Sequence, residues 1–319
     1  MKIIFFTKED WEEEYIKNAF PADEVACYKN SLQEALASGL YKGDLDAEVL
    51  CVFVTSRVGE EELALFPNLR LVATRSTGFD HVDVPAAQAR GIAVATVPAY
   101  GAVTVAEFAF ALILSLSRRI CEAHTRTAQE HALSQGGLRG FDLFEKTLGI
   151  VGCGHIGAHV ARIAAGFGMR VVVCDEHEDH ALAEKLGFRY APLLEVLGVS
   201  DVVTLHAPYS PQTHHLINKK NIAAFKAGAY LINTARGALV ETEALIEALE
   251  SGALAGAGLD VLEDEHQLTK EETALAQHAR VIVTPHIAFD TTEAVVRIME
   301  TTVANIKTFL AGEPENIVH

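Results

Sequence analysis

Three short polar segments, each following a predicted buried strand, carry the side chains best suited to catalysis. They are Asn233-Thr-Ala-Arg-Gly237, Asp260-Val-Leu-Glu-Asp-Glu265 and Pro285-His-Ile-Ala-Phe289. An arginine can bind a carboxylate and a carbonyl oxygen together, and a histidine can give its proton to a developing alkoxide. A carboxylate beside that imidazole would orient it and stabilise its protonated form. Arg236, an acid of the second segment and His286 therefore suit the reduction of a 2-oxo acid.

A glycine turn near the middle of the chain predicts dinucleotide binding. Gly152, Gly154 and Gly157 form G-x-G-x-x-G between a predicted strand, 148–151, and a predicted helix, 158–167. The first glycine allows the tight turn, the second lets a pyrophosphate approach the backbone, and the third lets helix and strand pack closely. The helix N-terminus would hold the phosphates through free N–H groups and its dipole.

The acid that should follow such a turn is also present. A second predicted strand, 170–174, ends at Asp175, which lies 18 residues beyond Gly157 (175 − 157), about where a ribose-binding acid belongs. An acid there should accept the ribose hydroxyls and repel a 2′-phosphate, so we expect NAD rather than NADP. The alternative is a glycine-rich turn in some other α/β protein. A nucleotide-triphosphatase loop is disfavoured because no Gly-Lys-Ser/Thr follows.

Composition narrows the compartment and the partners. The net charge of −17 argues against a nucleic-acid or anionic-membrane surface. The five cysteines have no C-x-x-C spacing and are typical of reduced thiols in a cytoplasmic protein. The longest apolar stretch, 102–116, contains Glu107 and is too short to span a bilayer, and 1–6 is predicted as a strand rather than a leader. We expect a cytoplasmic protein with no membrane partner, no nucleic-acid partner and no bound metal.

Strands rich in Val, Ile and Leu alternate with helical segments along most of the chain. The expected strands are 2–7, 49–54, 69–74 and 92–95 in the N-terminal third, and 148–151, 171–174, 202–206, 230–233, 257–259 and 281–284 in the second half. Helical patterns lie between them, for example at 31–37 and 60–66. This alternation predicts parallel sheets with both faces covered, the second being a six-stranded doubly wound sheet.

Two long helices are expected to bracket the second sheet, at 103–117 and 291–310. Thr104 and Glu107 have capping-box spacing in the first turn of the former. The predicted fold is α/β with two Rossmann-like domains, the dinucleotide-binding domain being inserted into a flavodoxin-like substrate domain. The expected domains are residues 1–99 with 290–319 for substrate and 100–289 for NAD, and the cleft between them is the natural active site.

The chain resembles the D-isomer-specific 2-hydroxyacid dehydrogenases over nearly its full length, and most of all their NAD-dependent D-lactate dehydrogenases. The matching segments, in chain order, are T-R-S-T-G-F-D-H-V-D (74–83), V-P-A-Y (97–100), T-V-A-E (104–107), the glycine turn, L-H-A-P (205–208), N-T-A-R-G (233–237), G-L-D-V (258–261) and P-H-I-A-F (285–289).

The resemblance assigns a role to each catalytic candidate. It implies that Arg236 binds the substrate, that Glu265 is the carboxylate partner and that His286 is the acid/base. Asp260 would bind the nicotinamide carboxamide.

The resemblance also implies the remaining ligand contacts. The cofactor-binding residues would be Gly152, Gly154, His155, Ile156, Gly157, Asp175, His206, Ala207, Pro208, Thr213, Thr234, Ala235 and Asp260, with His155 and Ile156 at the pyrophosphate. The amides of Thr77 and Gly78 would hold the substrate carboxylate, and Tyr100 and Phe289 would line a small pocket around the substrate side chain.

Several of these residues have competing interpretations. His206 is equally compatible with a structural role, and Arg75 is expected in a buried structural pair rather than at a ligand. Cys153 lies in the phosphate turn, where N–H groups could favour a thiolate, although an inert small residue is the simpler interpretation. His155 replaces a commoner arginine, and Asp290 follows Phe289 where D-lactate enzymes often carry tyrosine.

The expected reaction is NADH-dependent reduction of pyruvate to D-lactate, with hydroxypyruvate, glyoxylate or a bulkier 2-oxo acid as alternatives. Formate dehydrogenases resemble the family but have glutamine where Glu265 stands, whereas phosphite oxidation is harder to exclude. An NADH sensor resembling the carboxy-terminal-binding corepressors is the alternative of another class. Those carry a long disordered tail, whereas this chain ends soon after its last helix. By the same resemblance we expect a homodimer that pairs through residues 101–137.

Overall fold

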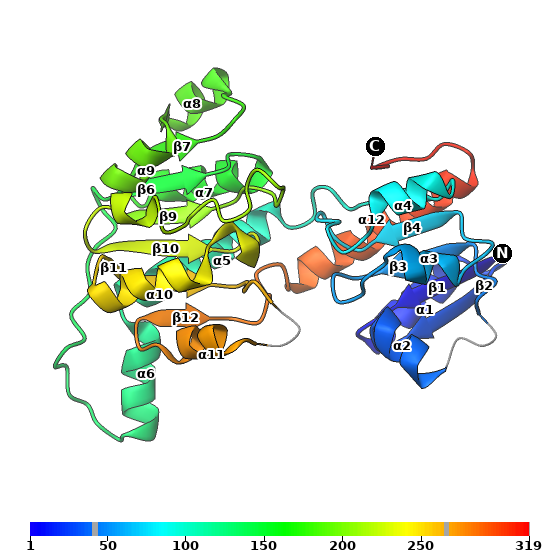
Figure 1. The fold of residues 1–319 in the computed structure, drawn as a ribbon, viewed down its shortest axis with the longest axis horizontal. Coiled ribbons are helices and arrows are strands. Elements are labelled where there is room, and N and C mark those ends of the chain that lie inside the picture. The colour runs from blue at the N-terminus through cyan, green and yellow to red at the C-terminus, as the bar shows by residue number, and fades with distance from the viewer. Residues whose placement is uncertain (40–43, 265–267, 319) are drawn as a thin grey trace. The chain divides into compact units, whose positions relative to one another are not determined.

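The computed structural model describes residues 1–39, 44–264 and 268–318, and the chain divides into two compact units (Figure 1). Unit 1 comprises Met1–Tyr100 and Thr291–His319, and unit 2 comprises Gly101–Asp290. The chain therefore leaves unit 1, builds unit 2 and returns. The expected boundaries, 1–99 with 290–319 and 100–289, differ from these by one residue at each crossing.

Unit 1 is a parallel sheet with helices on both faces (Figure 1). Its described strands are β1 (Lys2–Phe6), β2 (Glu24–Tyr28), β3 (Val49–Val52), β4 (Leu71–Thr74) and β5 (Ala93–Ala95), in the order β2-β1-β3-β4-β5. Its helices are α1 (Asp10–Ala19), α2 (Leu32–Ser38), α3 (Glu60–Ala64), α4 (Val84–Ala89) and α12 (Thr292–Leu310).

Alternation along the strands of unit 1 divides its core in two. Ile4 and Phe6 of β1 pack with residues of α2, α3 and α4, whereas Ile3 and Phe5 pack with residues of α1 and α12. Successive strand residues point to opposite faces, so an uninterrupted apolar run fills both cores. The expected helix at 291–310 is confirmed, and the Thr291 side chain caps it by accepting a hydrogen bond from the Ala294 amide.

Unit 2 is a larger parallel sheet of the doubly wound kind. Its described strands are β6 (Thr147–Val151), β7 (Arg170–Cys174), β8 (Arg189–Tyr190), β9 (Val202–Leu205), β10 (Ala229–Asn233), β11 (Leu254–Leu259) and β12 (Val281–Val283), in the order β12-β11-β10-β9-β6-β7-β8. Its helices are α5 (Ala102–Ser117), α6 (Ile120–Gln129), α7 (His155–Gly166), α8 (His180–Leu186), α9 (Leu193–Val199), α10 (Thr242–Ser251) and α11 (Lys270–Gln277). The six expected strands are present, and the short edge strand β8 adds a seventh among the described residues.

Helix α5 differs from expectation at its start. It begins at Ala102 with Gly101 as N-cap and has no side-chain cap. Thr104 is therefore inside the first turn and is buried, so the predicted capping box of Thr104 and Glu107 is wrong. The helix packs on α7 and on β10 and β11, and Thr104 is buried together with Val105 and Ala106.

A break separates α5 from α6. Arg119 has a φ of +52°, in the left-handed region, which ends one helix and redirects the chain into the next. None of the residues of α6 is buried within the chain. In the part of the chain that the structure describes, no helix is long and apolar enough to cross a membrane.

Candidate active site

All strands of unit 2 run parallel, so their carboxyl ends meet at one edge of the sheet. The segments singled out in the sequence follow these ends in turn. The glycine turn follows β6, Asp175 follows β7, the 206–208 segment follows β9, and the remaining three motifs follow β10, β11 and β12. We call this the cofactor edge of unit 2.

The glycine turn needs its first and third glycines for backbone reasons. Gly152 has a φ of +90°, and a Cβ there would lie 2.5 Å from the Ala207 amide nitrogen. A Cβ on Gly157 would lie 2.3 Å from the Gly152 carbonyl oxygen, inside the contact between α7 and the turn. A Cβ on Gly154 would meet nothing within 4 Å. The sequence predictions for the tight turn and the close packing are confirmed, and the backbone beside Gly154 is open.

Helix α7 begins directly after this turn. Gly154 is its N-cap, no side chain caps it, and the exposed His155 and half-buried Ile156 are its first two residues. The first amides of a helix have no intrahelical partner and carry the positive end of its dipole. This end of α7 is suited to hold a phosphate group.

Asp175 lies beside the turn, as its spacing predicted. Its carboxylate accepts hydrogen bonds from the Cys153 amide at 2.5 Å and from the His177 amide at 2.8 Å. Both bonds come from the backbone, so the position of the carboxylate follows from the fold. Each oxygen retains acceptor capacity for a further donor such as a sugar hydroxyl.

Cys153 does not have the environment of a reactive thiolate. Burial, assisted by the carboxylates of Asp175 and Asp179, raises the pKa of the Cys153 thiol to about 11. The amide of Cys153 donates to Asp175. The simpler interpretation of Cys153 as an inert residue is therefore favoured.

Two buried polar atoms at the cofactor edge have no hydrogen-bond partner among the described residues. They are the Nδ1 atom of His206 and the hydroxyl oxygen of Thr234. Buried polar atoms are nearly always paired, and an unpaired one indicates a missing ligand or water. Both residues are among those that the sequence assigns to the cofactor. Together with the open backbone at Gly154, they fit a dinucleotide with hydrogen-bonding groups along its length.

His206 is held neutral. Its Nε2 shares a hydrogen bond of 2.9 Å with the Thr204 hydroxyl, while its Nδ1 is buried. Although the residue as a whole is half-buried, burial disfavours the charged form of its imidazole and lowers the pKa of His206 to about 3. A neutral imidazole at this edge of the sheet can donate or accept one further hydrogen bond without adding charge.

A buried asparagine shapes the turn that carries Arg236. The Asn233 side chain donates to the Arg236 carbonyl at 2.8 Å and accepts from the Ala235 amide at 3.0 Å. The Arg236 guanidinium donates to the Ala235 carbonyl at 2.8 Å. Asn233 is therefore a positioning residue that the sequence placed in a motif without assigning it a role.

Gly237 brings this turn against the segment that follows β11. A Cβ on Gly237 would lie 2.0 Å from the Leu262 carbonyl carbon and 2.4 Å from the Glu263 nitrogen. Only glycine permits that approach. The arginine turn and the acidic segment are thus packed backbone to backbone.

Asp260 organises the turn that carries His286. Its carboxylate accepts hydrogen bonds from the Thr284 hydroxyl at 2.5 Å and from the amides of Ile287 at 3.0 Å and Ala288 at 2.8 Å. The His286 amide donates to the Asp260 carbonyl at 2.8 Å, and His286 has a φ of +53°. Such a φ in a residue with a side chain is strained and persists only when its surroundings fix it.

The environment of Asp260 affects its charge. Burial is the main cause that raises its pKa, against the lowering effect of the Thr284 hydroxyl, the two amides and His286. The carboxylate is therefore part of the His286 turn itself. Its predicted contact with the nicotinamide carboxamide uses an oxygen that already has protein partners.

The predicted substrate-pocket aromatic of unit 2 lies beside the predicted acid/base. The rings of Phe289 and His286 meet edge to face, with centroids 6.1 Å apart and an interplanar angle of 85°. Phe289 is buried, and the His286 ring is half-buried. Glu265, the predicted carboxylate partner, lies outside the described residues, so its contacts stay a prediction.

In unit 1, the predicted carboxylate-binding residues follow β4. The Thr77 hydroxyl donates to the Val97 carbonyl at 2.7 Å, and the Gly78 carbonyl accepts from the Ser76 hydroxyl at 2.6 Å. Tyr100 is half-buried, and its carbonyl accepts a hydrogen bond from Arg297 at 2.8 Å.

Arg75 has the structural role that was expected. It is buried, forms an ion pair with the buried Glu12 and donates to the Phe6 carbonyl at 2.5 Å. Since its partners are core groups of unit 1, Arg75 joins β4 to β1 and α1.

Comparison with known proteins agrees with this geometry. The family model described as "D-isomer specific 2-hydroxyacid dehydrogenase, NAD binding domain" matches residues 110–288. The D-lactate dehydrogenase of Escherichia coli is 35% identical over 98% of this chain and 98% of its own. The glyoxylate reductase of Korarchaeum cryptofilum is 38% identical over 86% and 83%.

A solved structure extends the agreement to three dimensions. The D-lactate dehydrogenase from Aquifex aeolicus, complexed with NAD and lactic acid, has a TM-score of 0.88 and 37% sequence identity. The match covers 99% of this chain and 98% of that one. The fold is therefore shared along nearly the whole length of both chains.

Proposed function

The chain belongs to the D-isomer-specific 2-hydroxyacid dehydrogenases, whose cofactor is NAD, and from that premise we propose that it reduces a small 2-oxo acid to the D-2-hydroxy acid. The physiological substrate that we propose is pyruvate, which gives D-lactate. The observation that carries the proposal is the turn at Asp260, which fixes a strained His286 beside Phe289 at the edge where the cofactor residues gather.

The roles of the polar residues follow from their chemistry. The cofactor edge of unit 2 would hold NADH, which would supply the hydride for the carbonyl carbon of the substrate. Arg236 binds the substrate carboxylate and polarises the carbonyl oxygen. His286 gives the proton from its imidazolium to the developing alkoxide, and Glu265 orients that ring. Hydride and proton together convert the ketone to the alcohol.

The cofactor residues divide among the parts of the dinucleotide. His155 and Ile156 meet the pyrophosphate at the start of α7, and Asp175 takes the ribose hydroxyls. Ala207, Pro208 and Thr213 line the nucleotide. His206, Thr234 and Ala235 contribute polar atoms and backbone near it.

The pocket residues favour a small side chain. Phe289 is buried against His286, so an apolar wall stands next to the proton donor. We propose that it contacts the methyl group of pyruvate. We propose for Tyr100 a contact with the substrate side chain, and for the amides of Thr77 and Gly78 a contact with the substrate carboxylate. One methylene in an apolar pocket is worth about 1–3 kcal/mol, so hydroxypyruvate, glyoxylate and bulkier 2-oxo acids are the competitors.

The test is NADH oxidation with pyruvate, hydroxypyruvate, glyoxylate, phenylpyruvate and 2-oxoisocaproate, compared by kcat/KM. We expect pyruvate to exceed each competitor by about tenfold or more, as one methylene of discrimination implies. A preference for glyoxylate would overturn the proposed substrate and keep the reaction class. NADH binding with no turnover of any of them would favour the NADH sensor.

We also propose that the enzyme works as a cytoplasmic homodimer. All five cysteines are free, which suits a reducing compartment. The Ile120 side chain of α6 is exposed, so it is available for contact with a second copy of this chain.

A further inference from the structure

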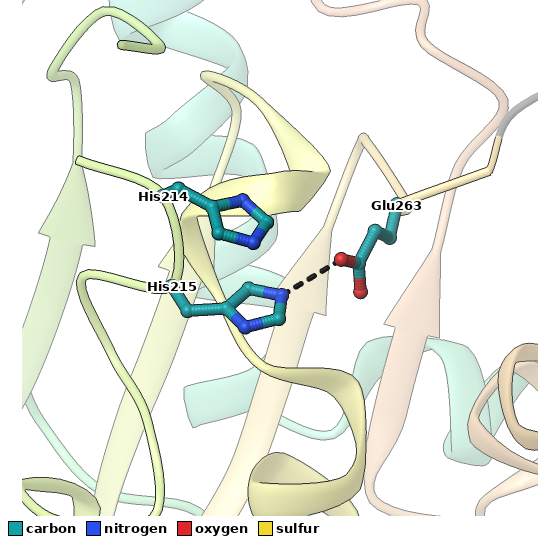
Figure 2. A group of neighbouring side chains, drawn as sticks. All are labelled: His214, His215 and Glu263. Carbon is teal, nitrogen blue, oxygen red and sulfur yellow. Dashed lines mark hydrogen bonds and ion pairs between the residues drawn. The ribbon is translucent and has the colours of Figure 1, made fainter. Parts of the chain in front are cut away.

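The loop after β9 places two histidines beside a carboxylate from the segment after β11 (Figure 2). The His215 Nε2 lies 2.7 Å from a carboxylate oxygen of Glu263. One ligand atom from each of His214, His215 and Glu263 can be chosen so that all three lie within 4.8 Å of one another. Of the residues that the structure describes, these form the one group of three with metal-ligand character.

Backbone geometry explains how neighbouring histidines share one side of the loop. His215 has a φ of +48°, in the left-handed region. Its ring stacks on that of His214, with centroids 3.9 Å apart and planes 21° apart. Figure 2 shows both rings directed toward Glu263. In extended chain the two side chains would point to opposite sides, so a strained residue is what brings both imidazoles to the carboxylate.

The loop is fixed on both sides of the pair. The His214 amide donates to the Ser210 carbonyl at 2.9 Å, and the His215 amide donates to the Ala238 carbonyl at 2.8 Å. The Asn218 side chain donates to the His215 carbonyl at 2.7 Å. A backbone held in this way keeps both histidines on one side of the loop before any ligand arrives.

The carboxylate is also oriented. The Thr242 hydroxyl donates to the second oxygen of Glu263 at 3.3 Å, while the first faces His215. The close backbone packing of Gly237 against Leu262 fixes the start of the segment that carries Glu263. The three side chains therefore come from two segments that the fold already joins.

We propose that His214, His215 and Glu263 form a binding site for a divalent transition-metal ion, with Zn²⁺ as the best match. Two imidazole nitrogens and one carboxylate oxygen are the ligands that Zn²⁺ takes at about 2.0–2.2 Å, with water in a fourth position. Mg²⁺ and Ca²⁺ prefer sets made of oxygen atoms. The chain's net charge of −17 raises the local concentration of cations.

Only small movements of the three side chains are needed to bring their ligand atoms to the spacing of a zinc site. Tetrahedral ligands at these bond lengths lie about 3.3 Å apart. The distance of 2.7 Å between His215 Nε2 and the Glu263 carboxylate would therefore increase slightly. The other distances between ligand atoms are at most 4.8 Å, so each would decrease by at most about 1.5 Å. Rotation of the exposed His214 and of the Glu263 side chain achieves this.

Occupancy has a consequence that rests on the proposed function. His214 directly follows Thr213, a predicted cofactor residue, and Glu263 precedes the predicted catalytic Glu265 by two residues. A metal ion joining the two segments would hold both in one arrangement. We expect Zn²⁺ to slow turnover by restricting them.

Binding is measured without reference to activity. Protein freed of metal, carrying Cys121→Ser to remove its exposed thiol and saturated with NADH, competes for Zn²⁺ with a chromophoric chelator. We expect one bound equivalent, with a Kd raised at least about tenfold in His214→Ala and in Glu263→Gln, the scale of losing one partner in a metal site. His214→Ala leaves the ion pair of His215 and Glu263 in place, so the loop keeps its anchor.

A matched control is present in the chain. His180 lies 3.4 Å from Glu178 in an exposed pair that is not part of a metal-ligand group of three among the described residues. His180→Gln should bind Zn²⁺ as the parent does. Equal affinity in the parent, His214→Ala and Glu263→Gln would overturn the site, as would the absence of a bound equivalent.

Two further measurements test the metal ligands and the effect of the metal on turnover separately. Co²⁺ in the parent should give the intense visible absorption of four-coordinate cobalt, and His214→Ala should lose it; a spectrum unchanged by the substitution contradicts the assigned ligands. Zn²⁺ should lower kcat in the parent and leave kcat of His214→Ala unaffected. Binding without any effect on kcat would overturn the coupling alone. A parent without 2-oxo-acid activity would overturn the proposed function, while the binding result still decides the site.

Discussion

At the residue scale, the candidate site depends on polar side chains whose hydrogen bonds fix the backbone of the turns. Asp260 fixes the strained His286 turn through three hydrogen bonds, and Asn233 fixes the Arg236 turn through two. Both are buried. The side chains that would touch substrate are therefore positioned by polar residues behind them, as a preorganised site requires.

The lowered pKa of His206 predicts a specific pH dependence of stability. Its pKa is lowered to about 3, below the ordinary value of 6.5 that applies in the unfolded chain. The unfolded state therefore binds more protons between these values, and the folded state loses stability as the pH falls through this range. The free energy of unfolding should therefore fall between pH 7 and pH 5. Replacing His206 by Gln should make this fall smaller by at most about 2 kcal/mol, since a pKa unit is worth about 1.4 kcal/mol.

Urea unfolding at the two pH values measures this difference. His180→Gln removes an exposed histidine and serves as the control, with the pH dependence of the parent. An unchanged pH dependence in His206→Gln would show that its nitrogens are accessible to solvent in the folded protein.

Asp175 predicts the choice between the two nicotinamide cofactors. Its carboxylate is fixed by two backbone amides, so it cannot turn away from a 2′-phosphate without losing them. Like charges brought together cost several kcal/mol. We expect kcat/KM with NADH to exceed that with NADPH by at least about 100-fold, and Asp175→Ser to reduce this ratio about tenfold or more.

Steady-state kinetics with both cofactors measures the ratio. Glu178→Gln removes an exposed acid from the same loop and should keep the ratio of the parent. Comparable efficiency with NADPH in the parent would contradict the role given to Asp175.

At the element scale, substitutions in the glycine turn allow cofactor binding and folding stability to be tested separately. Gly154→Ala places a methyl group in open space, so the free energy of unfolding should stay within about 0.5 kcal/mol. The same methyl group would stand where the pyrophosphate approaches, and the Kd for NADH should rise at least about tenfold. Gly152→Ala, with a φ of +90° and a backbone collision, should lose more than about 1 kcal/mol of stability as well.

Thermal unfolding and NADH fluorescence titration measure the two effects on the same samples. Normal NADH affinity in a stable Gly154→Ala would show that the pyrophosphate does not approach this backbone.

The sequence predicted the strands well where a run of buried residues is enough to define them. Central strands such as β6 and β9 are mostly apolar and buried at every residue, and their bounds were predicted to within one residue. The edge strand β2 is mostly half-buried and the edge strand β8 has two residues, so neither has the apolar run on which that prediction depends. The capping box at Thr104 and Glu107 failed because tertiary packing, which sequence spacing does not contain, buries Thr104.

At the scale of the whole chain, contacts between distant segments were the least predictable part of the site. The glycine turn and its acid were predicted because their spacing is local. The support that Asn233 gives to the Arg236 turn was missed although the two lie in one motif, because nothing in the motif assigns the direction of a side chain. The cluster of His214, His215 and Glu263 joins residues 48 positions apart and has no local spacing to detect.

The exposed surface of α6 and the loop after it predicts the assembly. Ile120 is 51% exposed and Leu133 is 86% exposed, so neither apolar side chain is covered within the chain. We expect a homodimer through residues 101–137, with twice the chain mass of 34.5 kDa.

Size-exclusion chromatography with light scattering measures this mass. Ile120→Glu and Leu133→Glu together should shift the protein toward the monomer, because they bury charge in the proposed contact. Tyr209→Glu, which changes an exposed aromatic elsewhere in unit 2, should leave the mass unchanged. A stable monomer at micromolar concentration would contradict the prediction.

The most direct test of the central claim is the fate of the hydride. The protein is incubated with pyruvate and NADH carrying deuterium at the transferred position, and the product is analysed for chirality and label. We predict D-lactate alone, with one deuterium at C2, and its loss in His286→Ala at saturating NADH. Formation of L-lactate, or NADH binding without reduction of any 2-oxo acid, would contradict the account.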